Sequence, residues 1–285
     1  MYSWLWVLEM YDALVMSAGG TYGAAYVGAY KALEARNLTA RIKRFHGTSA
    51  GAIVATMAAC GLTSAEMMRV MEIVCAEKRP KLNLSRLSRD FGAMSVRSYL
   101  KSAMDEFLPQ GTTFVTIAKK HGVTLSVHAY NVQTRKLVDF GLEKTPDADV
   151  RECIEASCCV PFLFTPVIID GARHVDGAVS QRTPMHMVVD PKSTLVLDVK
   201  DCSQGEPNDV IQYMTILTAA ASRHIGAFDG DFVTIPIPEG TPGMLDLPVS
   251  KSEIDPLVRV GFEAVDNMIA SKIEAATGKH EDEDQ

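Results

Sequence analysis

The chain contains few cysteines, and no two of them have the CxxC spacing of a zinc ribbon or a redox pair. The six cysteines lie mostly in apolar stretches that favour helices: Cys60, Cys75, Cys153, Cys158, Cys159 and Cys202. A disulfide framework or a zinc site is therefore not expected. Reduced thiols are typical of a cytosolic protein, and we expect the protein to be cytoplasmic.

An excess of positive charge is also missing. The chain has 28 Lys and Arg residues against 35 Asp and Glu residues, which gives a net charge of −7. Binding to nucleic-acid phosphates needs Lys and Arg in excess on one face, and the chain contains no RNA-binding or DNA-binding motif. The charge balance therefore argues against a nucleic-acid partner.

Long apolar runs are absent as well. No segment reaches the roughly 20 apolar residues that a membrane-spanning helix needs. The N-terminus lacks the positive region that opens a secretory signal, and Glu9 and Asp12 interrupt its apolar run. With 285 residues and 47% apolar content, the chain is typical of a soluble globular protein with a sizeable core.

Stretches that favour strands alternate with stretches that favour helices. Strands are predicted at Ala13 to Met16, Ile42 to His46, Thr124 to Tyr130, Lys136 to Phe140, Val167 to Ile169, Arg173 to Val175, Thr194 to Val199 and Phe232 to Ile237. Helices are predicted at Ala24 to Ala35, Ala50 to Ala59, Thr63 to Glu77 with a capping box, Val96 to Phe107, Asp149 to Cys159, Asp209 to Phe228 and Ile254 to Ala276. This alternation indicates an α/β fold with a mostly parallel sheet covered by helices on both faces.

The chain shows no internal repeat and no interdomain linker, so residues 1–278 are predicted to form a single domain. The charged segment 279–285 is predicted to be a disordered acidic tail. Lys78 to Lys101 differs from the rest in composition, because seven basic residues accompany a single acid, Asp90. Proline and glycine break this stretch, which is predicted to be an irregular insertion that leads into the next helix.

Gly47-Thr48-Ser49-Ala50-Gly51 lies between a predicted strand and a predicted helix. The pattern GxSxG in this position is typical of a nucleophile elbow, a sharp turn that exposes a serine hydroxyl. Small neighbours tolerate the strained turn, and the N-terminus of the following helix favours a developing negative charge. The pattern alone also occurs by chance, so its partners elsewhere in the chain decide its meaning.

Ser17 to Gly23 follows another short strand and is rich in glycine. Glycines let backbone N–H groups approach a ligand closely, and the helix that begins near Ala24 adds its dipole. Such a loop can form an oxyanion hole, a dinucleotide or phosphate loop, or only a tight turn. Its position about 26 residues before the GxSxG stretch, in consecutive strand-loop-helix units, favours the oxyanion hole.

A serine nucleophile needs a base. The histidines are His46, His121, His128, His174, His186, His224 and His280, and none follows a late strand in the way that α/β-hydrolases require. Asp176 is the better candidate, because Gly177 and Ala178 allow a turn that aims its carboxylate at an open site directly after a strand. An Asp-Gly pair is more often only a turn.

These three stretches together resemble the patatin-like phospholipases. That family has a glycine-rich oxyanion loop of the form GGGxRG, a GxSxG elbow and a late DGG or DGA turn, and the same order is found here. Glu155 to Val167 is also similar to the stretch that precedes the aspartate in the family. The resemblance covers the chain from about Ala13 to Pro184.

The resemblance implies a patatin-like three-layer sandwich and a Ser-Asp dyad that works without histidine, cofactor or metal. Ser49 would be the nucleophile, Asp176 the base, and the N–H groups of Gly19 and Gly20 the oxyanion hole. The other motif positions are Ala18, Gly23, Gly47, Gly51, Gly177 and Ala178. The implied activity is hydrolysis of a fatty-acyl ester, often a phospholipid, through an acyl-enzyme.

The chain departs from the family pattern at two positions. Ala18 replaces the first glycine, which matters only if that position needs a positive φ. Tyr22 replaces the arginine, so that a fixed cation near the loop is missing. We therefore expect activity that is reduced or shifted toward neutral esters.

Three alternatives stay open at this stage. An acyltransferase would use the same acyl-enzyme with an alcohol or lysolipid acceptor, and a catalytically silent protein would only bind lipid or act as a scaffold. A histidine-based α/β-hydrolase is a minor alternative.

A lipid substrate requires some approach to a membrane surface. Trp4 and Trp6 lie in an apolar N-terminal stretch and could contact lipid headgroups, or could pack on the core as part of an extra element. The basic stretch Lys78 to Lys101 could meet anionic lipid, or could be a solvated face. Peripheral membrane contact through Trp4, Trp6 or the basic stretch is therefore one of the two interpretations that stay open for each stretch.

Overall fold

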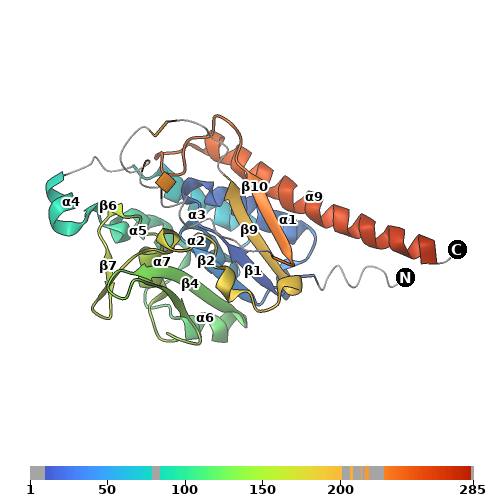
Figure 1. The fold of residues 1–285 in the computed structure, drawn as a ribbon, viewed down its shortest axis with the longest axis horizontal. Coiled ribbons are helices and arrows are strands. Elements are labelled where there is room, and N and C mark those ends of the chain that lie inside the picture. Colours follow the sequence, from blue (N-terminus) through green and yellow to red (C-terminus); the bar gives the residue numbers. More distant parts are fainter. Residues whose placement is uncertain are drawn as a thin grey trace.

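The computed structural model describes residues 10–78, 84–200, 206–207, 213, 216–217 and 228–283. Its centre is an eight-stranded sheet with the order β10-β9-β1-β2-β4-β8-β7, in which β5 also pairs with β4 (Figure 1). The strands on the parallel side are β1 (Ala13–Met16), β2 (Arg44–Thr48), β4 (Thr124–Asn131), β9 (Thr194–Lys200) and β10 (Asp231–Pro236). The antiparallel strands are β5 (Lys136–Gly141), β7 (Val167–Ile169) and β8 (Ala172–Asp176).

The helices pack around this sheet, and the predicted α/β class with a mostly parallel sheet is confirmed. The helix α2 (Ala50–Ala59) is buried along its whole length against β1, β2 and β4. The other helices are α1 (Ala24–Ala35), α3 (Ser64–Ala76), α4 (Leu84–Asp90), α5 (Val96–Phe107), α6 (Phe114–His121), α7 (Val150–Ser157) and α9 (Lys251–Glu283). The capping box predicted for α3 is present, since Thr63 and Glu66 bond to each other's backbone N–H groups.

Several elements differ from the sequence-based prediction. The strand β2 begins at Arg44 and ends at Thr48, two residues later than predicted, because it runs directly into the turn at Ser49. The stretch predicted to be irregular contains α4 and the short strand β3 (Gly92–Met94), which pairs with β6 (Phe162–Phe164) in a second small sheet. The helix α6 was not predicted at all, although Thr113 forms a capping box with Thr116.

The closing helix is longer than predicted. It continues to Glu283, beyond the predicted end at Ala276. The predicted helix from Asp209 to Phe228 and the tryptophans Trp4 and Trp6 lie outside the described residues, apart from a few positions of that helix. No helix within the described ranges is long and apolar enough to cross a membrane. The five cysteines that the structure describes are free thiols.

The helices α1 and α9 pack so closely that their backbones touch. A Cβ atom on Gly28 would lie 1.9 Å from the carbonyl oxygen of Val258, and one on Gly261 would lie 1.9 Å from the carbonyl oxygen of Ala25. Real Cβ atoms do not approach backbone oxygens this closely, so any side chain at these positions must push the helices apart. The pair fixes α1, which begins directly after the glycine-rich loop.

We predict that Gly261→Ala lowers the free energy of unfolding by about 1–3 kcal/mol, because the added methyl overpacks the contact between α1 and α9. In an unobstructed helix the same change would stabilise the protein by about 1 kcal/mol. The sign of the change in unfolding free energy therefore shows whether the two helices leave room for a methyl group at this position. Urea denaturation followed by circular dichroism measures it. Ser271→Ala on an exposed position of the same helix is the control and should raise stability slightly.

Candidate active site

Ser49 occupies the turn between β2 and α2, as the GxSxG pattern predicts. Its backbone has φ 55° and ψ −124°, a conformation that residues with a side chain rarely adopt. A Cβ atom on Gly47 would lie 2.4 Å from the carbonyl oxygen of Gly51, and a Cβ atom on Gly51 would lie 2.4 Å from that of Met16. Both glycines are therefore required by close backbone approach, and the serine carries the strain of the turn.

Ser157, which the sequence did not single out, holds this turn in place. The backbone N–H of Ser49 donates to Ser157 Oγ at 2.8 Å, and Ser157 Oγ donates to the carbonyl oxygen of His128 at 2.6 Å. All three residues are buried, so each bond replaces one that water would otherwise make. Ser157 lies within the stretch Glu155 to Val167, which the sequence analysis singled out only for its similarity to the family. Nothing else in the sequence indicated that Ser157 bonds to the Ser49 turn.

Asp176 is the last residue of β8, and the structure brings it to Ser49. The Ala178 N–H donates to Asp176 Oδ1 at 2.9 Å, which aims the carboxylate, and Asp176 lines the same cavity as Ser49. Gly177 is needed because a Cβ atom there would lie 2.7 Å from the carbonyl oxygen of His128. Burial raises the pKa of Asp176 from 3.8 to about 6, although the Ser49 side chain and the Ala178 N–H act in the opposite direction.

The glycine-rich loop lies on the other side of Ser49. Gly19 precedes the short 3₁₀ turn η2 (Gly20–Gly23), and the first N–H groups of such a turn have no carbonyl within it to bond. Gly20 has φ 54°, and a Cβ atom there would lie 2.1 Å from the carbonyl oxygen of Met244. Gly23 lets the loop pack on α2, since a Cβ atom there would lie 3.0 Å from Cβ of Ala50. Ala18 is not among the described residues with positive φ, so its methyl group is tolerated.

Arg182 supplies a cation beside this loop that the sequence reading did not find. Its Nε donates to the carbonyl oxygen of Ala18 at 3.0 Å, and the backbone N–H of Ala18 donates back to the carbonyl oxygen of Arg182 at 3.0 Å. A second guanidinium nitrogen donates to the carbonyl oxygen of Val199 and lies 3.5 Å from Asp198 Oδ1. Tyr22, at the position of the family's arginine, is fully buried.

Two narrow cavities, of about 60 and 50 Å³, meet at Ser49. The first is lined by Asp176, Arg182 and the glycine-rich loop, and the second by apolar side chains. The second set is Ile53, Val74, Tyr99, Leu100, Val160, Leu163, Phe164, Met244, Leu245 and Leu247. The segment around Met244 closes both cavities, although nothing in its sequence indicated this.

Neither cavity is lined by a histidine of the described residues. The thiol of Cys158 lies beside Ser49, but burial holds its pKa well above the ordinary value, so it stays protonated and is a poor nucleophile. His128, Asp139 and His186 form the one group of potential metal ligands in the described part of the chain, and this group borders a different cavity. Ser49 and Asp176 are therefore the candidate nucleophile and base of this site.

We predict that Ser49→Gly is more stable than Ser49→Ala by about 1 kcal/mol, because glycine relieves the strained backbone while alanine keeps it. Chemical denaturation of both variants measures the difference. The same two changes at Ser98, an exposed position within α5, should give the opposite order. Equal stability of the two Ser49 variants would show that the turn carries no strain.

Comparison with known proteins gives relatives of moderate sequence identity. The chain is 25% identical over 190 residues to "Probable lipid hydrolase 463L" of Invertebrate iridescent virus 6, covering 64% of each chain. It is 29% identical over 170 residues to the human omega-hydroxyceramide transacylase, covering 57% of this chain and 29% of that protein. The chain thus spans about two thirds of the viral relative and less than a third of the human one.

Solved structures show the same fold at low sequence identity. VipD from Legionella pneumophila matches with a TM-score of 0.62 and 16% identity, over 92% of this chain and 67% of that one. The human GIVD cytosolic phospholipase A2 matches with a TM-score of 0.57 and 10% identity, over 95% of this chain and 63% of that one. The family model of patatin-like phospholipases matches residues 14–189, which is more than half of the chain and includes all three motif stretches. The chain therefore belongs to the patatin-like phospholipase family.

Proposed function

We propose that the protein is a serine acyl hydrolase that cleaves fatty-acyl esters through Ser49 and Asp176. The observation that carries this proposal is that Ser49 and the buried Asp176 carboxylate line one cavity together with Gly19 and Gly20. A hydroxyl, a base and backbone donors are the three parts that acyl transfer by serine needs. Membership of a family of lipid hydrolases and acyltransferases supports a lipid ester as substrate.

In the first step, Ser49 Oγ attacks the ester carbonyl and its proton passes to Asp176. The negative charge that develops on the carbonyl oxygen is stabilised by the N–H groups of Gly19 and Gly20 and by the dipole of the helix that follows. The tetrahedral intermediate expels the alcohol, which takes the proton from Asp176, and leaves an acyl group on Ser49. Water then attacks the acyl-enzyme with Asp176 again as the base, and the fatty acid leaves.

Burial makes Asp176 a better base than an ordinary aspartate. A carboxylate with a pKa near 4 is a weak proton acceptor for a serine hydroxyl, whereas the pKa of about 6 lies closer to neutral pH and still leaves the group ionised there. The apolar cavity beside Ser49 suits an acyl chain, but it is narrow, so a long chain enters only if the lining side chains move apart.

The alcohol part of the substrate is proposed to be neutral. Arg182 directs its nitrogens to the carbonyl oxygens of Ala18 and Val199 and lies beside Asp198, so its charge is used within the protein. Tyr22 is buried away from the cavity. Neither residue therefore offers a free cation to an anionic headgroup, in line with the expected preference for neutral esters.

Contact with a lipid surface remains a proposal. In the basic stretch, Arg86 and Arg89 lie beside Asp90, and Lys101 lies beside Asp105. Arg97 forms ion pairs with Glu152 and Glu155. These cations already form ion pairs with carboxylates of the protein, which weakens the case for an anionic membrane as their partner. The tryptophans Trp4 and Trp6 remain the other proposed contact.

Ser49→Ala is expected to abolish hydrolysis of a panel of neutral and anionic lipid esters, and Asp176→Asn to lower it by roughly 10³-fold or more. In the wild-type protein, kcat/KM should fall as the pH drops through about 6, because protonation removes the base. Asp170→Asn, on the exposed turn before β8, is the matched control and should keep full activity. Full activity of Asp176→Asn would exclude the Ser-Asp dyad and favour a histidine base.

A second candidate, acyl transfer to an alcohol or lysolipid, is favoured by the names of two relatives, the human transacylase and the mouse 1-acylglycerol-3-phosphate O-acyltransferase Pnpla3. Both reactions pass through the same acyl-enzyme. Analysis of the products with and without added lysophospholipid distinguishes them, since a transferase forms a new ester at the expense of free fatty acid. A protein that only binds lipid would leave Ser49 unlabelled by a fluorophosphonate probe.

Arg182→Met is predicted to lower kcat by about 10- to 100-fold with KM changed less than about twofold. Loss of the guanidinium frees the carbonyl oxygen of Ala18 and shifts the N–H groups of the loop, which act mainly on the transition state. Arg182→Lys should restore only part of the activity, because an ammonium cannot bond to both carbonyl oxygens in the same plane. Circular dichroism checks folding, and an equal loss in both kcat and 1/KM would contradict a positioning role.

A further inference from the structure

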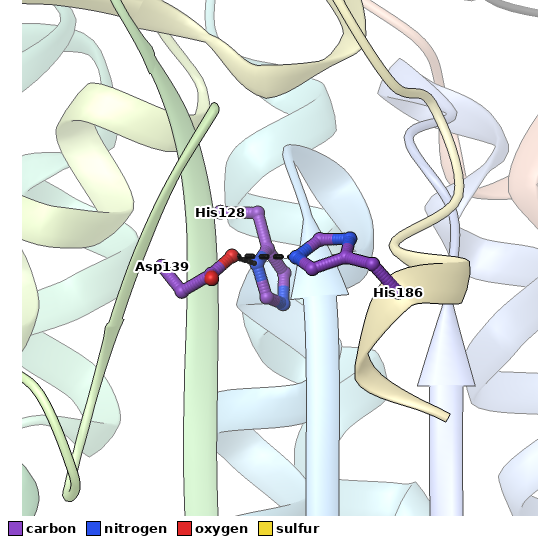
Figure 2. A group of neighbouring side chains, drawn as sticks. All are labelled: His128, Asp139 and His186. Atoms are coloured by element: carbon purple, nitrogen blue, oxygen red, sulfur yellow. Dashed lines mark hydrogen bonds and ion pairs between the residues drawn. The ribbon is translucent and has the colours of Figure 1, made fainter. Parts of the chain in front are cut away.

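We propose that His128, Asp139 and His186 bind a divalent transition metal ion of the zinc class. The three side chains come from β4, from β5 and from the 3₁₀ turn η5 (Met185–Met187), and they point toward one another (Figure 2). None of them lines the two cavities at Ser49. One potential ligand atom from each lies within 4.8 Å of the others. The site is separate from the proposed acyl transfer, and it departs from the sequence-based expectation of a protein without metal.

The donor set suits zinc. Zinc binds imidazole nitrogen and carboxylate oxygen, and sites with three protein ligands leave a fourth position for water. His128 Nδ1 lies 2.8 Å from Asp139 Oδ1, and His186 Nε2 lies 2.7 Å from the same oxygen. Ligand atoms around a tetrahedral zinc lie about 3.3 Å apart, so the side chains need to open by about half an ångström. The partly exposed His186 can supply this movement in its own pair with Asp139.

The contacts of His186 match those of a metal-bound histidine. Its Nδ1 faces Gln181 Oε1 at 3.0 Å, and its Nε2 faces Asp139 Oδ1 at 2.7 Å. With Gln181 oriented as in the structure, both ring nitrogens face acceptors, which either an imidazolium with two N–H groups or a neutral imidazole with a metal ion at Nε2 can satisfy. With the metal ion in place, Nδ1–H donates to Gln181, and an outer acceptor of this kind is usual for a metal-bound histidine.

The surroundings offer room and further polar atoms for such an ion. Asp139 and His186 line a cavity of about 290 Å³ together with His46 and Lys144. His46 Nδ1 and His128 Nε2 are buried and have no hydrogen-bond partner among the described residues. The His46 ring lies near that of His128, with 6.4 Å between the ring centroids.

Charge is also compatible with a cation at this position. Lys144 Nζ lies 2.6 Å from Asp139 Oδ2, and its side chain is 63% exposed. The ammonium can withdraw into solvent and leave the carboxylate to the metal. Arg44, the other cation on the cavity wall, is paired with Asp12. Asp139 therefore remains the main charge at the centre of the group.

A metal ion at this position would connect three segments, and two of them support the candidate active site at Ser49. The carbonyl oxygen of His128 accepts the bond from Ser157 that holds the Ser49 turn. His186 belongs to the segment that follows Asp176 in the chain. The role assigned to the ion is therefore structural: it ties β4 and β5 to the segment after Asp176.

The test uses the full chain without a histidine tag, freed of metal by a chelator. Titration calorimetry with Zn²⁺ should show one site per chain, and Co²⁺ should give the visible absorption of a tetrahedral complex. His186→Ala is expected to weaken Zn²⁺ binding by roughly 100-fold and to remove the Co²⁺ bands. His186 is only partly buried, so the variant should fold, and its melting curve in chelator checks this.

His121→Ala removes a histidine outside the group and should leave Zn²⁺ binding unchanged. Lys144→Ala should bind Zn²⁺ with equal or tighter affinity, because the competing ammonium is gone. The proposal is overturned if the wild-type protein binds no Zn²⁺, or if His186→Ala binds it as well as the wild type does. In either case the three side chains form only a hydrogen-bond network. Each readout is independent of esterase activity, so it stands apart from the proposed acyl hydrolysis.

Discussion

The close approach of backbones around Ser49 is the constraint on which the candidate site depends. Gly51 lies against the carbonyl oxygens of Met16 and Ser17, and Gly47 lies against Gly51 itself. These contacts bring the end of β1, the turn and the start of α2 together without any side chain between them. The positive φ of Ser49 is stable only because both flanking strands and the buried helix hold it. The glycine-rich loop begins at the end of β1, so the same contacts also place it beside Ser49.

Electrostatics at the site follow from burial. Asp176 is a carboxylate out of contact with water, which disfavours its charge and raises its pKa, while the Ser49 hydroxyl and one backbone N–H offset part of that cost. Beside the loop, the buried guanidinium of Arg182 bonds to the loop carbonyl of Ala18 and lies near Asp198, which also accepts a bond from Ser17. A buried cation in this setting stabilises the backbone of the loop rather than a bound anion.

A second polar group lies outside the cavities at Ser49 and shares an element with the site. His128 contributes its side chain to the group with Asp139 and its carbonyl oxygen to Ser157. One residue of β4 thereby supports both regions, because the side chain and the backbone carbonyl of a strand residue point in different directions. Rigid support of this kind is common where reactive side chains must keep their geometry.

What the sequence determined by itself was local. Most of the strands and helices, the capping box at Thr63 and the turn at Ser49 depend on neighbouring residues, and they appear in the structure. Ser49 and Asp176 are 127 positions apart, and their meeting could be predicted only through the resemblance to a family. Only the tertiary structure brought in Arg182, Ser157, the segment at Met244 and the group around Asp139, because contacts between distant segments leave no periodic pattern in the sequence.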